Sequence, residues 1–229
     1  MTRIKICGLM RIEDICLCIE AGVHALGFVV EYPLDVPWNL DRLTAQALMR
    51  TVPPFASRVI VVGDDPETII ALTEFLRPHA VQLHGNEPLA ATANIVLALK
   101  ALGVHVIKAL RFSVETGMCH SPCEDPLEAA RLIEEVGVDA LLLDSVGDGR
   151  PAGTGRSMNW NIARKIRESV HLPVILAGGL YAGNVGQAIA AVNPYGIDVI
   201  SGVENLVGEK DPKKVKAFVE AVKGSGNGP

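Results

Sequence analysis

The chain has 229 residues, of which 49% are apolar, 21% charged and only 4% aromatic. This apolar content excludes a disordered chain, and the length is enough for one large hydrophobic core. The net charge of −5 and the lack of a Lys/Arg cluster argue against a nucleic-acid partner, and no stretch approaches the ~20 apolar residues of a membrane span.

Short apolar runs alternate with longer amphipathic segments along the whole chain. Alternating strands and helices predict a parallel sheet covered by helices. In chain order, the predicted pairs of strand and helix are 3–7 with 12–20, 25–30 with 41–50, 58–62 with 66–76, 80–83 with 88–102, 105–109 with 126–136, 140–144 with 159–169, 173–177 with 184–192, and 196–201 with 211–222.

This alternation fits an open doubly wound sheet as well as a closed barrel, and two features favour the barrel. Each unit takes roughly 29 residues, the usual size in a (βα)8 TIM barrel. Segment 20–28 is also similar to segment 135–143, half a chain later, as a half-barrel repeat would be. We therefore predict an α/β fold with one (βα)8 barrel domain over residues 1–223 and a flexible C-terminal tail over 224–229.

The first strand places a cysteine where barrel enzymes carry their chemistry, at the C-terminal end of a strand. Side chains alternate along a strand, so Ile4 and Ile6 share the face toward the helices, while Lys5 and Cys7 face the barrel. A nearby ammonium lowers the pKa of a thiol, so we expect Cys7 to form a thiolate that acts as base or nucleophile. The alternative is an inert buried cysteine.

Asp144 ends the apolar run of the sixth predicted strand. Partial burial raises the pKa of a carboxylate, which suits a general acid near neutral pH. The alternative is a helix cap or a loop salt bridge.

Glycines follow the last two predicted strands, where barrels often bind phosphate. Glycine lets backbone N–H groups approach an anion closely, and a helix N-terminus adds a favourable dipole. The alternative is that these are only tight turns. The predicted phosphate-binding residues are Gly178, Gly179, Ser201 and Gly202.

Two loops are less specific. The Gly-rich loop 148–156, with Gly153 and Gly155, is long enough to fold over a ligand as a lid. Cys119, His120 and Cys123 lie close in sequence but have no partner pair at metal-ligand spacing, so we predict no metal site.

Five cysteines, an odd number, in a chain without a signal-peptide core fit a reducing, cytoplasmic location.

The strand-end motifs together resemble those of phosphoribosylanthranilate isomerase, a (βα)8 barrel of tryptophan biosynthesis. Their order and approximate spacing match over nearly the whole chain. The motifs are Lys5-Ile-Cys-Gly8, Gln82-Leu-His-Gly85, Leu143-Asp144, Gly153-Thr-Gly155, Ala177-Gly-Gly-Leu180 with Asn184, and Asp198-Val-Ile-Ser-Gly-Val-Glu204.

The resemblance implies an Amadori rearrangement of N-(5-phosphoribosyl)anthranilate to 1-(2-carboxyphenylamino)-1-deoxyribulose 5-phosphate without metal or organic cofactor. It places the acid at Asp144 and the base at Cys7. The only partner implied is a small phosphorylated sugar substrate, for a monomer or a homodimer. The motifs place further substrate contacts at Lys5, Gln82, His84, Gly153, Gly155 and Asp198.

The segment after the second strand departs from the family pattern, in which an Arg is expected to hold the anthranilate carboxylate. Here the loop 31–39 has neither the Ser nor the Arg, and Pro37 stands about where the Arg is expected. Proline cannot replace bidentate guanidinium recognition, so Arg42, Arg111 or Arg150 would have to substitute. The alternatives are a divergent paralogue acting on another phosphorylated aminosugar, or a non-catalytic phosphate-binding barrel.

Overall fold

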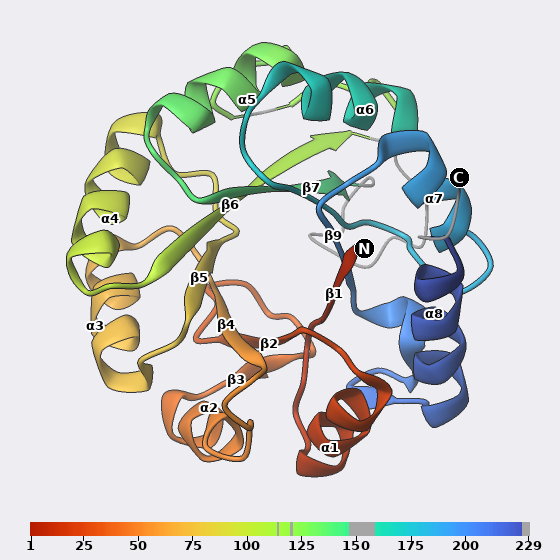
Figure 1. Cartoon of the computed structure of the whole chain (residues 1–229). Helices are drawn as coiled ribbons and strands as arrows, with labels where there is room; N and C mark the ends of the chain where they lie inside the picture. The colour runs from red at the N-terminus through yellow and green to blue at the C-terminus, as the bar shows by residue number, and fades with distance from the viewer. Residues whose placement is uncertain (114, 120, 147–158, 226–229) are drawn as a thin grey trace.

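The computed structural model describes residues 1–113, 115–119, 121–146 and 159–225. Viewed along the barrel axis, the strands form a central ring and the helices an outer ring (Figure 1). Neighbouring barrel strands pair in parallel, and the pairing of β1 with both β2 and β9 closes the sheet. The predicted (βα)8 barrel is therefore confirmed, and the open sheet is excluded.

The barrel strands follow the predicted segments closely. Two of them, β6 and β7, continue beyond their predicted ends and pair with each other outside the ring, as far as Ser113 and Val146. The strands are β1 (Arg3–Ile6), β2 (Ala25–Val30), β4 (Ser57–Val62), β5 (Ala80–Leu83), β6 (His105–Ser113), β7 (Ala140–Val146), β8 (Val174–Leu176) and β9 (Gly196–Val199).

The outer helices begin at the signals that the sequence carries. Asp41, Asp65, Asp125 and Asn159 cap helices by accepting hydrogen bonds from the backbone of the first turn. The helices are α1 (Ile12–Ala21), α2 (Arg42–Met49), α3 (Pro66–Leu76), α4 (Leu89–Ala101), α5 (Pro126–Glu135), α6 (Trp160–Ser169), α7 (Val185–Val192) and α8 (Pro212–Ser225).

Two apolar layers result from the alternation along each strand. Ile4 and Ile6 of β1 belong to the large layer between strands and helices, as predicted. A smaller layer fills the barrel interior with residues such as Val59, Ile107 and Leu142. Above it, the inward positions become polar, and these positions form the floor of the site.

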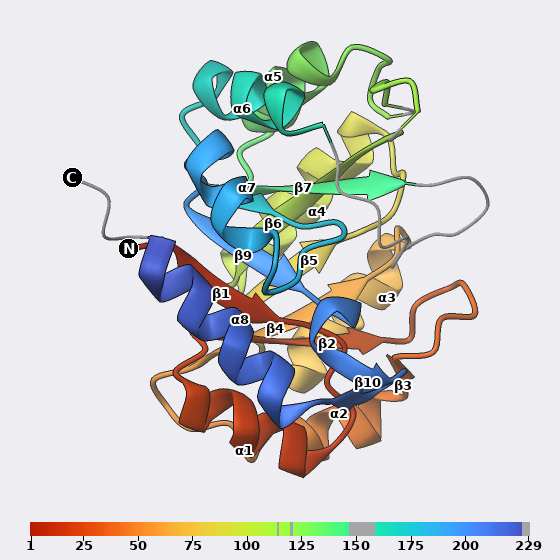
Figure 2. The ribbon, with the colours of Figure 1, turned by 90° about the vertical axis from the view of Figure 1, so that its right-hand side faces the viewer.

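Some short elements were not predicted, because two- or three-residue strands leave no periodic pattern. β3 (Asn39–Leu40) pairs with the end of β2. After β9, the 3-10 helix η1 (Ser201–Val203) leads into a hairpin of β10 (Glu204–Leu206) and β11 (Glu209–Lys210). Figure 2 shows β10 and β3 on the side toward which β7 points, which is the C-terminal mouth of the barrel.

No helix in the described residues is long and apolar enough to cross a membrane. Helix α8 continues to Ser225, so the first two residues of the predicted tail are helical, and residues 226–229 lie outside the described residues.

Candidate active site

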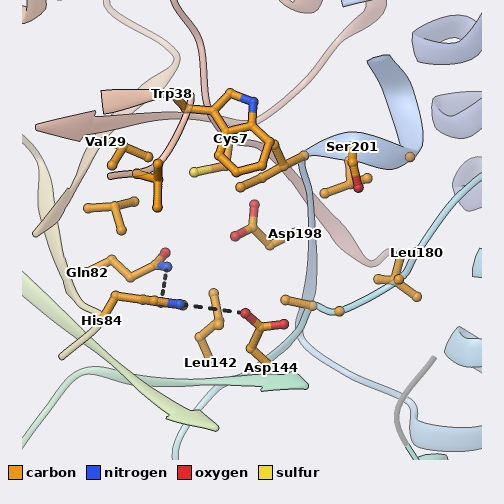
Figure 3. A pocket seen from close by; sticks show the side chains of 18 of the residues that line it. Cys7, Val29, Trp38, Gln82, His84, Leu142, Asp144, Leu180, Asp198 and Ser201 are labelled. Carbon is orange, nitrogen blue, oxygen red and sulfur yellow. Dashed lines mark hydrogen bonds and ion pairs between the residues drawn. The ribbon is translucent and has the colours of Figure 1, made fainter. Parts of the chain in front are cut away.

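A pocket that is open to solvent lies at the C-terminal mouth of the barrel. Figure 3 shows Cys7 on one side of it and Asp144 on the other, with Asp198 between them. The lining residues come from both halves of the chain, as expected where parallel strands end together. The site expected from the strand ends is thus one continuous pocket.

Cys7 lies directly after β1 and is 1% exposed. Gly27 of β2 leaves room for it, because a Cβ at that position would lie 2.5 Å from the Cys7 sulfur. Burial raises the pKa of the Cys7 thiol, and the nearby charge of Asp198 adds to this, whereas the ammonium of Lys5 lowers it. The expectation of a lowered pKa is therefore wrong, because desolvation outweighs the ammonium.

The ammonium of Lys5 is committed to a buried ion pair. Its Nζ donates to Oδ2 of Asp198 at 2.7 Å. Burial opposes the charged form of Lys5, but Asp198 and Cys7 together raise its pKa. Lys5 therefore holds Asp198 in place and contributes a positive charge below the sulfur.

Asp144 points into the pocket from β7. Burial raises its pKa to about 6, although the N–H of Ser145 donates to Oδ1 at 2.8 Å and opposes this shift. The direction agrees with the prediction from its place at the end of an apolar strand. A carboxyl group with this pKa can give up a proton near neutral pH.

His84 connects Asp144 to Gln82. Burial lowers the pKa of His84 to about 3, and the charges of Arg111 and Lys108 add to the effect, so the ring is neutral. The Gln82 amide nitrogen lies 3.2 Å from Nδ1, and Nε2 lies 3.6 Å from Oδ2 of Asp144. The Gln82 amide donates to Nδ1, so the proton of the neutral imidazole is on Nε2 and faces the carboxyl group of Asp144. Because the ring is neutral, this contact is not an ion pair.

Two acceptors on the pocket wall have no donor. Oδ1 of Asp198 and Oε1 of Gln82 are buried without a hydrogen-bond partner among the described residues. Buried polar atoms are normally paired, so these oxygens are available to ligand hydroxyl groups.

The turn after β8 has an open backbone. Gly178 and Gly179 adopt positive φ angles of 77° and 64°, and the described residues provide no acceptor for the N–H groups of Gly178, Gly179 and Leu180. Asn184 braces the turn by donating to the Gly179 carbonyl at 2.9 Å. Backbone N–H groups without partners in such a turn form a concavity that can bind an anion.

The neighbouring turn after β9 closes this cradle. Ser201 and Gly202 line the same pocket. A side chain at Gly202 would collide with the carbonyl oxygen of Leu180. The predicted phosphate-binding residues therefore lie together at one end of the pocket.

The apolar end of the pocket was not predicted. Val29, Tyr32, Trp38 and Val61 form a small cluster with Cys7. Trp38 Nε1 donates to Oε1 of Glu204 at 2.9 Å, and the Tyr32 hydroxyl donates to the carbonyl of His84 at 3.0 Å. The signal in the sequence was the aromatic pair within the 31–39 loop.

Several predicted residues are placed elsewhere or not described. Lys5 lies beneath the pocket rather than on its wall. Cys119 is buried and Cys123 partly buried outside the pocket. Gly153, Gly155, Arg150, His120 and the predicted lid lie outside the described residues.

Comparison with known proteins agrees with this geometry. Residues 4–221 match the family profile of N-(5′-phosphoribosyl)anthranilate (PRA) isomerase. The chain is 38% identical over 228 residues to N-(5′-phosphoribosyl)anthranilate isomerase 1 of Methanosarcina mazei, covering 97% of this chain and 95% of the relative.

Solved structures show the same fold. Monomers of the dimeric phosphoribosylanthranilate isomerase from Thermotoga maritima align with a TM-score of 0.79 and 31% identity, over 98% of this chain and 100% of theirs. A phosphoribosyl anthranilate isomerase in complex with reduced 1-(o-carboxyphenylamino)-1-deoxyribulose 5-phosphate aligns with a TM-score of 0.77 and 32% identity, over 98% and 100% of the two chains.

Proposed function

The chain belongs to the N-(5′-phosphoribosyl)anthranilate isomerase family, and we propose that its mouth pocket performs the isomerisation with Asp144 as general acid and Cys7 as general base. The protein is an isomerase of tryptophan biosynthesis. The observation that carries the assignment of roles is that a carboxyl group with a pKa of about 6 and a thiol lie on opposite sides of one pocket.

The pocket has three zones that match the parts of the substrate. The phosphate binds the N–H groups of the Gly178–Gly179 turn and of Ser201 and Gly202. The aromatic ring lies in the apolar end beside Trp38. The ribose then spans the space between Cys7 and Asp144.

Protonation by Asp144 opens the sugar ring. The acid donates its proton to the furanose ring oxygen, the C1–O bond breaks toward that oxygen, and the nitrogen lone pair forms the C1=N iminium. Asp144 is left as a carboxylate. A pKa of about 6 keeps a useful protonated fraction near neutral pH.

Cys7 then removes the proton from C2. The C–H electron pair forms the C1=C2 bond, and the iminium electrons return to nitrogen, which gives a neutral enolamine. Tautomerisation adds a proton at C1 and removes the enol proton, which leaves the ketone. The Lys5 ammonium and the cationic iminium both favour the thiolate that this step needs.

Asp198 and Gln82 orient the sugar between these two groups. Their unpartnered oxygens accept hydrogen bonds from sugar hydroxyls. His84 directs its Nε2 toward Asp144 and is a positioning residue for that carboxyl group. The partner of this site is thus a small phosphorylated sugar, and a free Cys7 thiol is maintained in a reducing cytoplasm.

Substitution of the two catalytic groups tests the assignment. We expect Cys7→Ser and Asp144→Asn each to slow turnover by at least ~100-fold, the scale of general acid–base catalysis. The matched controls are Cys16→Ser, an exposed thiol on α1, and Asp65→Asn, which preserves a helix cap. Rates near wild type for either catalytic variant would refute its role.

A further inference from the structure

The loop 31–39 lacks the expected arginine and provides no cation of its own for the substrate carboxylate. The apolar end of the pocket is built by Tyr32, Val36 and Trp38, and the same loop carries Glu31 and Asp35. A carboxylate on an aromatic ring held there would meet no positive charge from this loop. Another element must therefore neutralise it, if the substrate is the one proposed above.

Among the residues that the structure describes, the other cations near this end of the pocket are paired with carboxylates. Lys108 Nζ lies 2.8 Å from Oε1 of Glu87 and also donates to the Gly85 carbonyl. Arg42 makes a bidentate pair with Glu31, with both N···O distances at 2.7 Å. A cation already neutralised in this way gains little from a second carboxylate.

Arg111 is different. Its Nη2 donates to Oδ1 of Asn86 at 2.6 Å, a neutral amide oxygen, and no carboxylate pairs with it among the described residues. A guanidinium has five N–H donors, so most of its donors have no protein partner in this part of the chain.

The register of the barrel directs Arg111 toward the site. Along β6, Ile107 and Ala109 face the barrel interior, so Arg111, two residues further on, lies on the same face. Its Cα pairs with that of Asp144 on β7. Its positive charge also acts on Tyr32 and His84, which both line the pocket.

We propose that Arg111 binds the carboxylate of the substrate's aromatic ring and so performs in this chain the recognition expected from the 31–39 loop. Asn86 is a positioning residue that fixes one edge of the guanidinium and leaves the other edge for a bidentate contact. The aromatic ring stays between Tyr32 and Trp38, and its carboxylate points toward the rim at the end of β6.

A pair of ligands that differ only in the carboxylate tests this proposal. The probes are reduced 1-(o-carboxyphenylamino)-1-deoxyribulose 5-phosphate and its anilino analogue, which lacks the carboxylate, with affinities measured by calorimetry. We expect the wild-type protein to bind the carboxylated probe at least ~30-fold more tightly, the usual scale for one truncated charge pair. Arg111→Met should bring this ratio to within ~3-fold of unity without weakening the anilino analogue.

Arg42→Met is the matched control, because Arg42 is already paired with Glu31, and it should leave the ratio unchanged. Asn86→Ala should lower the ratio only partly. The proposal is overturned if Arg111→Met keeps the wild-type ratio, if it weakens both probes equally, or if Arg42→Met abolishes the ratio. Absence of turnover by the wild-type protein would contradict the proposed function instead, and the ligand ratio would still report on Arg111.

Discussion

Burial acts on Cys7 and Asp144 in the same direction but with different consequences. It raises the pKa of the carboxyl group to about 6 and moves the thiol above its ordinary range. Asp144, the proposed acid, therefore titrates below Cys7, the proposed base. The reactive arrangement, with Asp144 protonated and Cys7 deprotonated, is one proton tautomer of the singly deprotonated site.

This order of pKa values predicts the pH profile. The singly deprotonated site dominates between the two pKa values, so kcat/KM should be level from about pH 6.5 to 8.5. It should fall about tenfold per pH unit below pH 6, where both groups are protonated. The measurement is kcat/KM from pH 4.5 to 9.5.

The substrate phosphate also titrates near pH 6, so its effect must be removed. The pH dependence of the inhibition constant of a non-reacting phosphosugar, measured in parallel, isolates that contribution. A corrected profile that stays level down to pH 4.5 would contradict the raised pKa of Asp144.

The same shift predicts that the acid destabilises the fold. Because its folded-state pKa of about 6 exceeds the unfolded value of ~3.9, Asp144 lowers the free energy of unfolding by up to about 3 kcal/mol above pH 6. Asp144→Asn should therefore raise the free energy of unfolding by 1–3 kcal/mol at pH 8, with the gain vanishing near pH 4. Urea unfolding at both pH values measures this, and a loss of stability at pH 8 would contradict it.

At the scale of elements, β1 was predictable in detail. Its alternation of Ile4 and Ile6 with Lys5 and Cys7 is a local pattern, and each side chain faces the predicted side. The raised pKa of Cys7 was not predictable, because it comes mainly from burial in the folded chain and in part from Asp198, which lies 191 residues away in the sequence. The local sequence pattern thus predicts which way a side chain faces, whereas its pKa depends on neighbours that only the tertiary structure brings together.

The 31–39 loop marks another limit. The absence of the expected Arg was visible in the sequence, but the hydrogen bond from Trp38 to Glu204 was not. That contact joins the loop after β2 to the hairpin after β9, two segments that meet only because the barrel closes. The residues that line the apolar end of the pocket could therefore not be predicted from the sequence alone.

The turn after β8 provides a test at the scale of elements. Gly179→Ala places a Cβ at a φ of 64° and disturbs the N–H groups offered to phosphate. We expect KM and the inhibition constants of simple phosphosugars to rise at least ~10-fold, because a charged hydrogen bond contributes about 1.5–3 kcal/mol.

Gly103→Ala is the matched control for this turn. Its φ of 73° imposes similar backbone strain, but no atom lies within 4 Å of the added Cβ. It should lose stability without a change in KM. Equal changes in KM for both variants would show that strain, and not phosphate contact, causes the effect.

For the whole molecule, the alternation of apolar and amphipathic segments predicted the strands and helices. It did not decide whether the sheet is open or closed into a barrel. The similarity between segments 20–28 and 135–143 favoured a barrel, and the pairing of β1 with β9 and β2 provides the closure. The short strands at the mouth escaped prediction, since their pairing is set by a ring that is already closed.

Because the barrel is closed, we expect the protein to unfold in a single cooperative transition. Helix α8 packs between α1 and α7 and buries Phe218 completely. Phe218→Ala should cost 3–5 kcal/mol, and Phe75→Ala, at a residue that is 38% exposed on α3, should cost much less. Tryptophan fluorescence and far-UV circular dichroism should give coincident transitions in urea; separate transitions would contradict one cooperative barrel.

The function proposed for this chain is the isomerisation of phosphoribosylanthranilate in the pocket between Cys7 and Asp144. The most direct measurement follows the fluorescence of freshly prepared phosphoribosylanthranilate after the purified protein is added. We expect a loss of fluorescence at a rate proportional to protein concentration, with formation of 1-(2-carboxyphenylamino)-1-deoxyribulose 5-phosphate. Unchanged fluorescence with protein that circular dichroism shows to be folded would contradict it.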